Sequence, residues 1–433
     1  MRIPDHLPTT LIDRSVLSWH ELGLAEFMLQ IEMEFDCSLD ADRLARALDL
    51  LLDAEPVLGC RLATNPILPY WKRVSGDERK IFSIAAAELE YDSFRVEPID
   101  FTSGPQVKAC LFRAADGDRL LLKVSHVAAD AGGTKETAAR LADIYSRLGN
   151  DPHYIPEPNL RGDRGIAQLF RQVPIGKIPV VFSDFLRGTW THTAPPPTLT
   201  LPLPEIDAHR RELAYTVRSL DVERTAALSA YGRERHATLN DMVIAAAFRA
   251  LAATAHWDGS AGLFLQMTFD YRRWYLPSGR AGGICNLSGF EYPTPGSELG
   301  ADFEATLARI STFTRRRKER MPGLAIAFTS PVLLSLPYFG LKTFFKALEG
   351  GLIANKNHPD TFTNMGPIEK ETLMFGKNPP RRAWMLVPPI YPPIFGFGMS
   401  GYAGSLTLSS GGPRPIMETA ENFLDALMNE LPS

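Results

Sequence analysis

The spacing of apolar residues predicts strands and helices in the first part of the chain. Residues 27–37 alternate between apolar and polar types, as a half-buried strand does, and residues 39–54 change to helical spacing. Two apolar runs, residues 105–112 and 119–125, flank a short polar turn and predict a β-hairpin. Helical spacing returns at residues 134–148, so the pattern indicates an α/β structure.

The same kinds of element recur in the second part of the chain. Residues 213–220 predict a strand, and residues 222–231 and 239–253 predict helices. A further strand is predicted at residues 263–269, and an amphipathic helix is predicted near the C-terminus at residues 414–431. Strands and helices therefore occur in both parts of the chain.

A proline-rich stretch separates the two parts. The frequent prolines between residues 149 and 203 predict a linker with short ordered segments. A chain of 433 residues is also too long for one ordinary core and suits two domains of about 150–250 residues. We therefore expect an N-terminal lobe at residues 1–160, a crossing linker at 161–210 and a C-terminal lobe at 211–433.

Composition and charge narrow the class of protein. Hydrophobic residues make up 45% of the chain and charged residues 22%, as in ordinary globular proteins. The formal net charge of −4 provides no broad basic surface, so a nucleic-acid partner is not expected. A folded enzyme is the class that fits these values.

The cysteines and the N-terminus predict a cytoplasmic protein. The N-terminal residues include Pro4 and Asp5, where a signal peptide would need an uninterrupted apolar core. The cysteines lie too far apart for a disulfide framework, and we expect buried thiols in a reducing compartment. They are Cys37, Cys60, Cys110 and Cys285.

An uncharged stretch at residues 323–341 raises the question of a membrane span. Pro331 and Pro337 interrupt it, so a helix pair that lines an apolar interior or tunnel is favoured over a span. Contact with a membrane is expected to be peripheral at most, with help from the lysines that follow. These lysines are Lys342, Lys346 and Lys356.

Common signatures of large enzyme classes are absent from the sequence. It contains no Walker A loop, no HExxH helix and no GxSxG elbow. Residues 396–401 match GxGxxG, but a strand pattern follows them where a phosphate-facing helix would be needed, so dinucleotide binding is not expected. The basic run at residues 315–318 is typical of a solvated helix end, and phosphate binding is the alternative interpretation.

His126 is the sharpest candidate for chemistry. It stands at the end of an apolar strand and shortly before Gly132 and Gly133, where a loop can present a side chain to a cleft. A buried structural histidine is the alternative. A metal site is not expected, because the strand-to-loop segment that carries His126 and Asp130 offers no third ligand nearby.

The segment from Ser125 to Gly132 resembles the HxxxDG motif of the chloramphenicol acetyltransferase-like superfamily. This superfamily includes condensation domains of nonribosomal peptide synthesis, wax ester synthases and plant BAHD acyltransferases. Further segments that resemble the superfamily occur in the same order over nearly the whole chain. They are Asp53–Leu58 with Arg61, Gly104-Pro105, Leu239–Ala247, Asp270–Arg272, Thr363–Pro367 and Gly401–Leu406.

The resemblance implies a fold and a function. The fold is two α/β lobes in a V with a central tunnel, and the function is the transfer of an acyl group from a thioester to a hydroxyl or amine. It implies no tightly bound cofactor. The donor would be acyl-CoA or an acylated phosphopantetheinyl carrier protein, and the acceptor would be a small molecule.

The resemblance also implies roles for individual residues. His126 would be the general base. Asp130 would turn away from the substrate and pair with Arg272, with Arg273 as the fallback, and Gly132 would support the same loop.

Asn364 and groups near Ser400 are the further candidates, as contacts for the oxyanion or substrate. Two positions depart from the pattern. Condensation domains usually have a first histidine where this chain has Ser125, and Ala131 stands where the motif usually has its glycine. A carrier-dependent condensation or cyclisation enzyme and a non-catalytic binding homologue therefore remain as alternatives.

Overall fold

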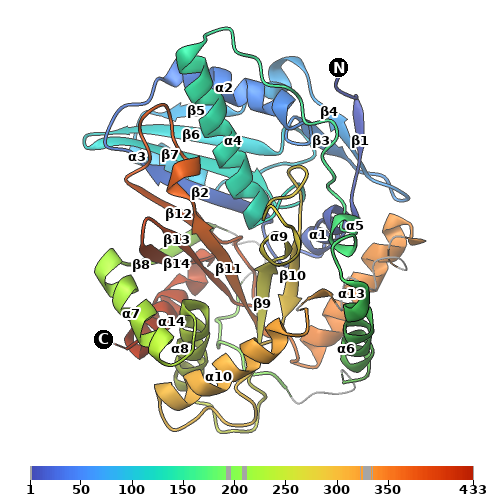
Figure 1. Cartoon of the computed structure of the whole chain (residues 1–433), viewed down its shortest axis with the longest axis vertical. Coiled ribbons are helices and arrows are strands. Elements are labelled where there is room, and N and C mark those ends of the chain that lie inside the picture. The colour runs from blue at the N-terminus through green and yellow to red at the C-terminus, as the bar shows by residue number, and fades with distance from the viewer. Residues whose placement is uncertain are drawn as a thin grey trace.

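The computed structural model describes residues 2–191, 197–206, 212–321, 323–324, 333 and 335–432, and only the backbone of residues 185–191. The strands of this described part form three sheets. Together with their helices they make two lobes, which lie one above the other in Figure 1. The α/β class and the two-lobed architecture predicted from the sequence are confirmed.

The larger sheet of the first lobe has the strand order β12-β2-β7-β6-β5. Neighbouring strands are antiparallel except for β5 and β6, which run parallel. The last six residues of β7 are all buried, so the strand that leads to His126 is fixed in the core. The first-lobe strands of this sheet are β2 (Met28–Glu34), β5 (Phe82–Ala85), β6 (Val107–Ala114) and β7 (Gly117–Ser125).

In the first lobe, α2 (Ala41–Ala54) and α4 (Ala131–Asn150) pack against each other, and α4 also packs against β2 and β7. Asp40 and Asp130 cap the two helices by accepting hydrogen bonds from main-chain N–H groups of the first turn. A small sheet of order β1-β4-β3 completes the lobe. The elements are α1 (Leu11–Glu21), α2 (Ala41–Ala54), α3 (Glu88–Val96), α4 (Ala131–Asn150), β1 (His6–Pro8), β3 (Cys60–Ala63) and β4 (Tyr70–Arg73).

The second lobe is built on a six-stranded sheet of order β10-β9-β11-β13-β14-β8. The helix α8 packs against α10 and α14 beside it. The strands are β8 (Leu213–Leu220), β9 (Leu265–Asp270), β10 (Ser288–Glu291), β11 (Asp360–Ile368), β13 (Gly396–Tyr402) and β14 (Ser405–Pro413). The helices are α7 (Val222–Glu234), α8 (Leu239–Thr254), α9 (Tyr271–Tyr275), α10 (Phe303–Lys318), α13 (Tyr338–Ala354) and α14 (Met417–Glu430).

One strand connects the C-terminal part of the chain to the first lobe. β12 (Arg382–Leu386) pairs antiparallel with β2, and Met365 and Tyr402 join the hydrophobic core of the first lobe. The expected C-terminal lobe at residues 211–433 therefore contributes to both lobes. The expected linker holds α5 (Ala167–Phe170) and α6 (Ile178–Thr191), and parts of it lie outside the described residues.

Two of the sequence patterns are placed differently by the structure. Of the apolar stretch 323–341, residues 325–332 and 334 lie outside the described residues, and its end begins α13. In the described ranges we find no helix that is long and apolar enough to cross a membrane. The GxGxxG match lies within β13, where Cβ atoms at Gly396 and Gly398 would come within 2.5 Å of Ile390 and Val387. These glycines therefore permit close packing over the sheet.

Candidate active site

His126 follows β7 directly and begins the loop at residues 126–130 that leads into α4. Its main-chain N–H donates to the carbonyl of Phe27 over 2.8 Å. Its ring lies edge-on to the Phe27 ring, with 5.9 Å between the centroids, and is half-buried. The main-chain hydrogen bond and the ring contact with Phe27 therefore hold His126 in place at the end of β7, at the boundary with the second lobe.

Asn286 fixes the orientation of the His126 ring. Its Nδ2 donates to the carbonyls of His126 and Val127, both over 3.1 Å, so its Oδ1 must face the other way. Oδ1 lies 3.2 Å from Nδ1 of His126 and can only accept a hydrogen bond there. The proton is therefore on Nδ1, and Nε2 keeps a free lone pair. No motif in the sequence indicated Asn286.

Asp130 is held by hydrogen bonds on every side. It caps α4 by accepting from the N–H of Gly133 (2.9 Å), and it accepts from the N–H of Leu287 (2.6 Å) and the hydroxyl of Ser288 (2.7 Å). Its carboxylate also forms an ion pair of 2.9 Å with Nη1 of Arg272. The aspartate that lies four residues after His126 thus ties the loop to the second lobe.

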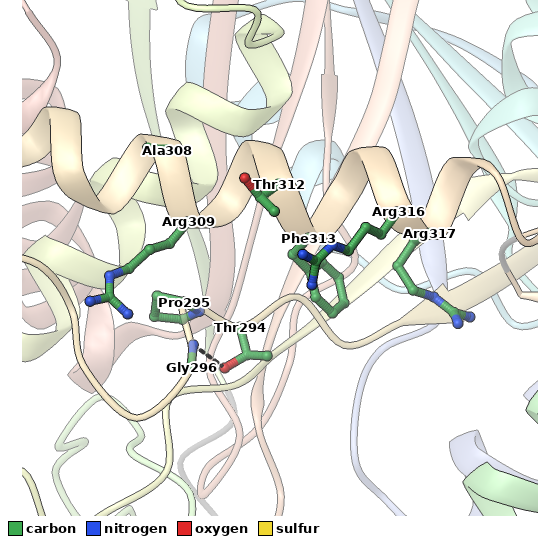
Figure 2. A pocket seen from close by; sticks show the side chains of 9 residues that line it. All are labelled: Thr294, Pro295, Gly296, Ala308, Arg309, Thr312, Phe313, Arg316 and Arg317. Atoms are coloured by element: carbon green, nitrogen blue, oxygen red, sulfur yellow. Dashed lines mark hydrogen bonds between the residues drawn. The ribbon is translucent and has the colours of Figure 1, made fainter.

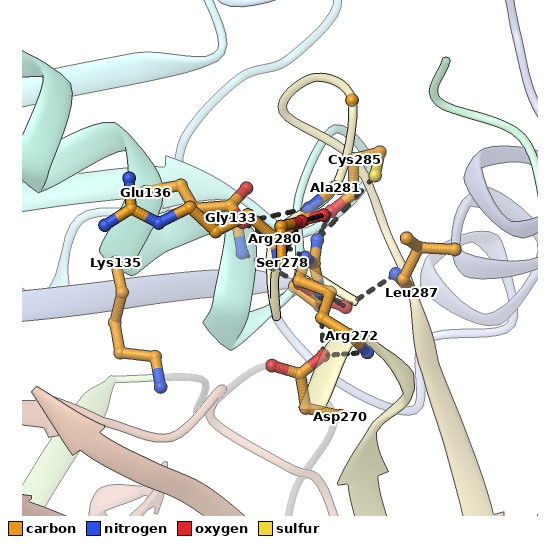
Figure 3. Close-up of polar contacts among 12 residues, drawn as sticks. Gly133, Lys135, Glu136, Asp270, Arg272, Ser278, Arg280, Ala281, Cys285 and Leu287 are labelled. Atoms are coloured by element: carbon orange, nitrogen blue, oxygen red, sulfur yellow. Dashed lines mark hydrogen bonds and ion pairs between the residues drawn. The ribbon is translucent and has the colours of Figure 1, made fainter. Parts of the chain in front are cut away.

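Arg272 is the cation of this cluster and is only 1% exposed. Besides Asp130, its guanidinium pairs with Asp270 at 3.1 Å and Glu136 at 3.4 Å, and it donates to the carbonyl of Cys285 over 2.8 Å. Figure 3 shows Arg272 between Asp270 and the segment that carries Cys285. A guanidinium matches such a set because it has five donors in a fixed plane.

Gly132 lies against the same guanidinium. A Cβ at this position would be 2.6 Å from Nη1 of Arg272 and 2.9 Å from Oδ2 of Asp270. Arg273, which the sequence left as the fallback partner of Asp130, is exposed and takes no part in the pair. The loop residues His126 and Asp130, with Gly132 and Arg272, therefore form one contiguous group.

Burial and neighbouring charges shift the pKa values of His126, Asp130 and Glu136. Burial lowers the pKa of His126, although the charge of Asp130 and the hydrogen bond that the ring donates to Asn286 act to raise it. Burial alone would raise the pKa of Asp130, but Arg272 and the hydrogen bonds hold it at about 2. Burial raises the pKa of Glu136 to about 7. The site at neutral pH therefore holds a neutral imidazole beside a charged carboxylate.

Asn364 and Ser400 lie on the neighbouring strands β11 and β13. The side chain of Asn364 donates to Oδ1 of Asn240 over 2.8 Å and accepts from the N–H of Gly366 over 2.9 Å. The hydroxyl of Ser400 is buried and accepts from the N–H of Met385 over 3.0 Å. These bonds do not reach His126, so the two residues are not part of the group around the imidazole.

A cavity of about 850 Å³ opens between the lobes beside this group. Its wall includes Gly132, Glu136 and Arg272, together with Lys135, which the sequence did not single out. His126 is not in its wall. The cavity therefore borders this group at Gly132 and Arg272.

A second cavity, of about 640 Å³, lies on the second lobe beside α10. Figure 2 shows Arg309, Phe313 and Arg316 projecting from this helix toward the segment of Thr294. Arg317, from the basic run, is not simply solvated, because it pairs with Glu291 at 2.7 Å. Within the described part of the chain, no three His, Cys, Asp or Glu side chains group as metal ligands.

Comparison with solved structures gives full-length matches. The first condensation domain of the CDA synthetase matches with a TM-score of 0.66 and 16% identity, covering 99% of this chain and 97% of its own. Polyketide synthase associated protein 5 from Mycobacterium tuberculosis matches with a TM-score of 0.62 and 18% identity, covering 97% and 98%. A trichothecene 15-O-acetyltransferase from Fusarium sporotrichioides matches with a TM-score of 0.66 and 10% identity, covering 99% and 96%.

No protein-family model matches the chain, and no curated protein matches it. The likeness is therefore one of structure, over the whole length and with both lobes. The segments that resemble the superfamily in sequence are found in this same fold. The chain has the chloramphenicol acetyltransferase-like fold that condensation domains and the trichothecene acetyltransferase share.

Proposed function

We propose that the protein is an acyltransferase that moves an acyl group from a thioester to a hydroxyl or amine, with His126 as the general base. The observation that carries the proposal is the hydrogen bond between Nδ1 of His126 and Asn286. It leaves the lone pair of Nε2 available, and burial lowers the pKa of the ring, so the imidazole is neutral near pH 7.

The proposed reaction needs one proton carrier. The acceptor O–H or N–H gives its proton to Nε2 of His126 while its oxygen or nitrogen attacks the thioester carbonyl carbon. The tetrahedral oxyanion then collapses, the carbon–sulfur bond breaks, and the leaving thiolate takes the proton back from the imidazolium. Because both substrates are held together, no acyl-enzyme is required.

The residues around the base have supporting roles in this proposal. Asp130 pairs with Arg272 and therefore positions the loop, and it does not take the proton itself. Asn364 and Ser400 remain the proposed contacts for the oxyanion or the substrate. No tightly bound cofactor is needed, because the donor thioester supplies the activated acyl group.

The second candidate is a carrier-protein-dependent condensation or cyclisation enzyme. Structural neighbours favour it, since they include condensation domains and a cyclisation-docking bidomain. The residue before His126 argues against a standard condensation domain, because it is Ser125 where such domains usually have a histidine. The two candidates differ in what carries the acyl donor.

The full chain is incubated with acyl-CoA or with an acylated carrier protein, together with a set of hydroxyl and amine acceptors. Mass spectrometry then detects the transferred acyl group. Transfer from acyl-CoA supports the first candidate, and transfer from the carrier protein alone supports the second. Absence of transfer from both donors would favour a non-catalytic binding homologue.

A further inference from the structure

The segment at residues 159–168, which includes the start of the expected linker, packs closely against the segment that carries Asn286. A Cβ at Gly162 would lie 2.4 Å from the carbonyl oxygen of Gly282, and a Cβ at Gly282 would lie 2.7 Å from the main-chain nitrogen of Asp163. Only glycine leaves room for so close an approach of the two main chains. The expected linker therefore begins with a segment that is fixed beside the site.

Arg164 extends from this segment to the loop that carries His126, and its side chain is only 14% exposed. Its Nε donates to the carbonyl of Ile284 over 2.7 Å, and its Nη2 donates to the carbonyl of Ala128 over 3.1 Å. It also forms an ion pair with Asp13 of α1, with 3.1 Å between Nη1 and Oδ2. One planar guanidinium thus joins three segments that are far apart in the sequence.

Asp13 is fully buried and holds the guanidinium of Arg164 in place. Its carboxylate also accepts from the main-chain N–H of Thr10 over 3.0 Å, in the capping box of α1, and from Nε1 of Trp71 over 3.0 Å. Because these bonds fix the carboxylate, they also fix the direction in which Arg164 presents its other donors.

The two carbonyls that Arg164 binds flank the hydrogen bond between His126 and Asn286. Ala128 lies two residues after His126, and Ile284 lies two residues before Asn286. The side chain of Asn286 binds the carbonyls of the two residues directly before Ala128. The 3.2 Å contact between the imidazole and the amide therefore depends on the separation that Arg164 maintains between the two segments.

We propose that Arg164 is a positioning residue, which holds the His126 loop and the Asn286 segment at the separation that lets Asn286 fix the tautomer of the imidazole. This rests on the proposed function, in which the neutral ring of His126 is the general base. Arg164 binds main-chain carbonyls and Asp13, so it acts through the placement of other groups and takes no part in the proton transfer.

The first test reads the tautomer of His126 by ¹⁵N NMR of the imidazole, at a pH at which the ring is neutral and without substrate. Subtraction of the His126→Ala spectrum identifies its signals among the nine histidines. The unaltered protein should carry the proton on Nδ1. Arg164→Lys keeps a cation beside Asp13 but loses the planar fork that spans both carbonyls, so it should populate both tautomers.

The second test measures acyl transfer in two backgrounds. Arg164→Lys alone should lower kcat roughly tenfold and leave KM nearly unchanged, because it disturbs the base and not the substrate contacts. In Asn286→Leu the same substitution should lower kcat less than about threefold, because the contact that it disturbs is already absent. A merely structural role would give equal factors in the two backgrounds.

The matched control is Arg171→Lys, which changes an exposed arginine that pairs with Asp163 at 3.2 Å and should alter neither tautomer nor kcat. Thermal unfolding shows which variants are folded. Gly162→Ala leaves the guanidinium intact but pushes its segment away from Gly282, so it should disturb the tautomer in the same direction. If Arg164→Lys does not fold, Gly162→Ala decides the question.

An unchanged tautomer in a folded Arg164→Lys or Gly162→Ala protein would overturn the positioning role, and so would equal factors in the two backgrounds. The tautomer is read without substrate, so this failure is distinguishable from failure of the proposed function. A changed tautomer in Arg164→Lys together with normal acyl transfer by His126→Ala would leave the positioning correct and the base wrong. An unchanged tautomer with an inactive His126→Ala protein would mean the reverse.

Discussion

Nδ1 of His126 lies 3.2 Å from Oδ1 of Asn286, a residue 160 positions later in the chain. The amide of Asn286 is itself fixed by two main-chain carbonyls of the His126 loop. The tautomer of the imidazole is therefore set by a contact between segments of the two lobes. A change at Asn286 should affect the chemistry without touching the base.

Asn286→Leu should lower kcat roughly tenfold to a hundredfold, because the ring loses the partner that holds its tautomer. The hydrogen bond that His126 donates to Asn286 also acts to raise the pKa of His126. Its loss should move the acid limb of the pH–rate profile to lower pH. A substitution that only reduced the amount of folded protein would lower the rate and leave the limb in place, and that result would contradict the positioning role.

The pH dependence of the unaltered protein follows from the lowered pKa of His126. The base works only when neutral, so kcat/KM should fall on the acid side, with a midpoint below the ordinary imidazole value of about 6.5. The free energy of unfolding should also fall as the pH falls, because His126 binds a proton more readily in the unfolded chain than in the folded one. The contribution of His126 to unfolding free energy should thus be lost as pH falls below about 6.5. A rate midpoint above 7 would contradict this.

Asp130→Ala should destabilise the protein by about 3–5 kcal/mol, because it leaves the buried guanidinium of Arg272 without its closest carboxylate. Urea unfolding measures this. The control is Asp425→Ala, which removes an exposed partner of Arg218 and should cost less than about 1 kcal/mol. An Asp130→Ala protein as stable as the control but inactive would show that the aspartate does not brace the loop.

Gly132→Ala should cost about 1–3 kcal/mol, since the new methyl would enter the space of Arg272 and Asp270, whose side chains are held in ion pairs. Gly176→Ala is the matched control. Its Cβ would have no atom within 4 Å, so that variant should be neutral or slightly stabilised. Equal thermal midpoints for the two variants would contradict the close approach.

Local periodicity predicted much of the fold. The strand predicted at residues 213–220 is β8 without change, and the helix at 239–253 is α8 with one further residue. The edge strand β12 had no comparable signal, because its place depends on pairing with β2, more than 340 residues earlier. Short elements such as β10 and α9 likewise depend on tertiary contacts, which override local preference.

The candidate site could be predicted in part. Arg272 stands beside Asp130 as the resemblance implied, and the role of the pair remains a prediction. Asn286 was missed because it lies in a short segment before β10 with no periodic pattern, and its importance comes from where the chain folds.

The most direct measurement is single-turnover acyl transfer by His126→Ala, with a donor and acceptor pair that the unaltered protein uses. Thermal unfolding in parallel confirms that the variant is folded. Loss of the base should slow the chemical step by about 10²–10⁴-fold. A folded His126→Ala protein that transfers the acyl group at the unaltered rate would contradict His126 as the general base.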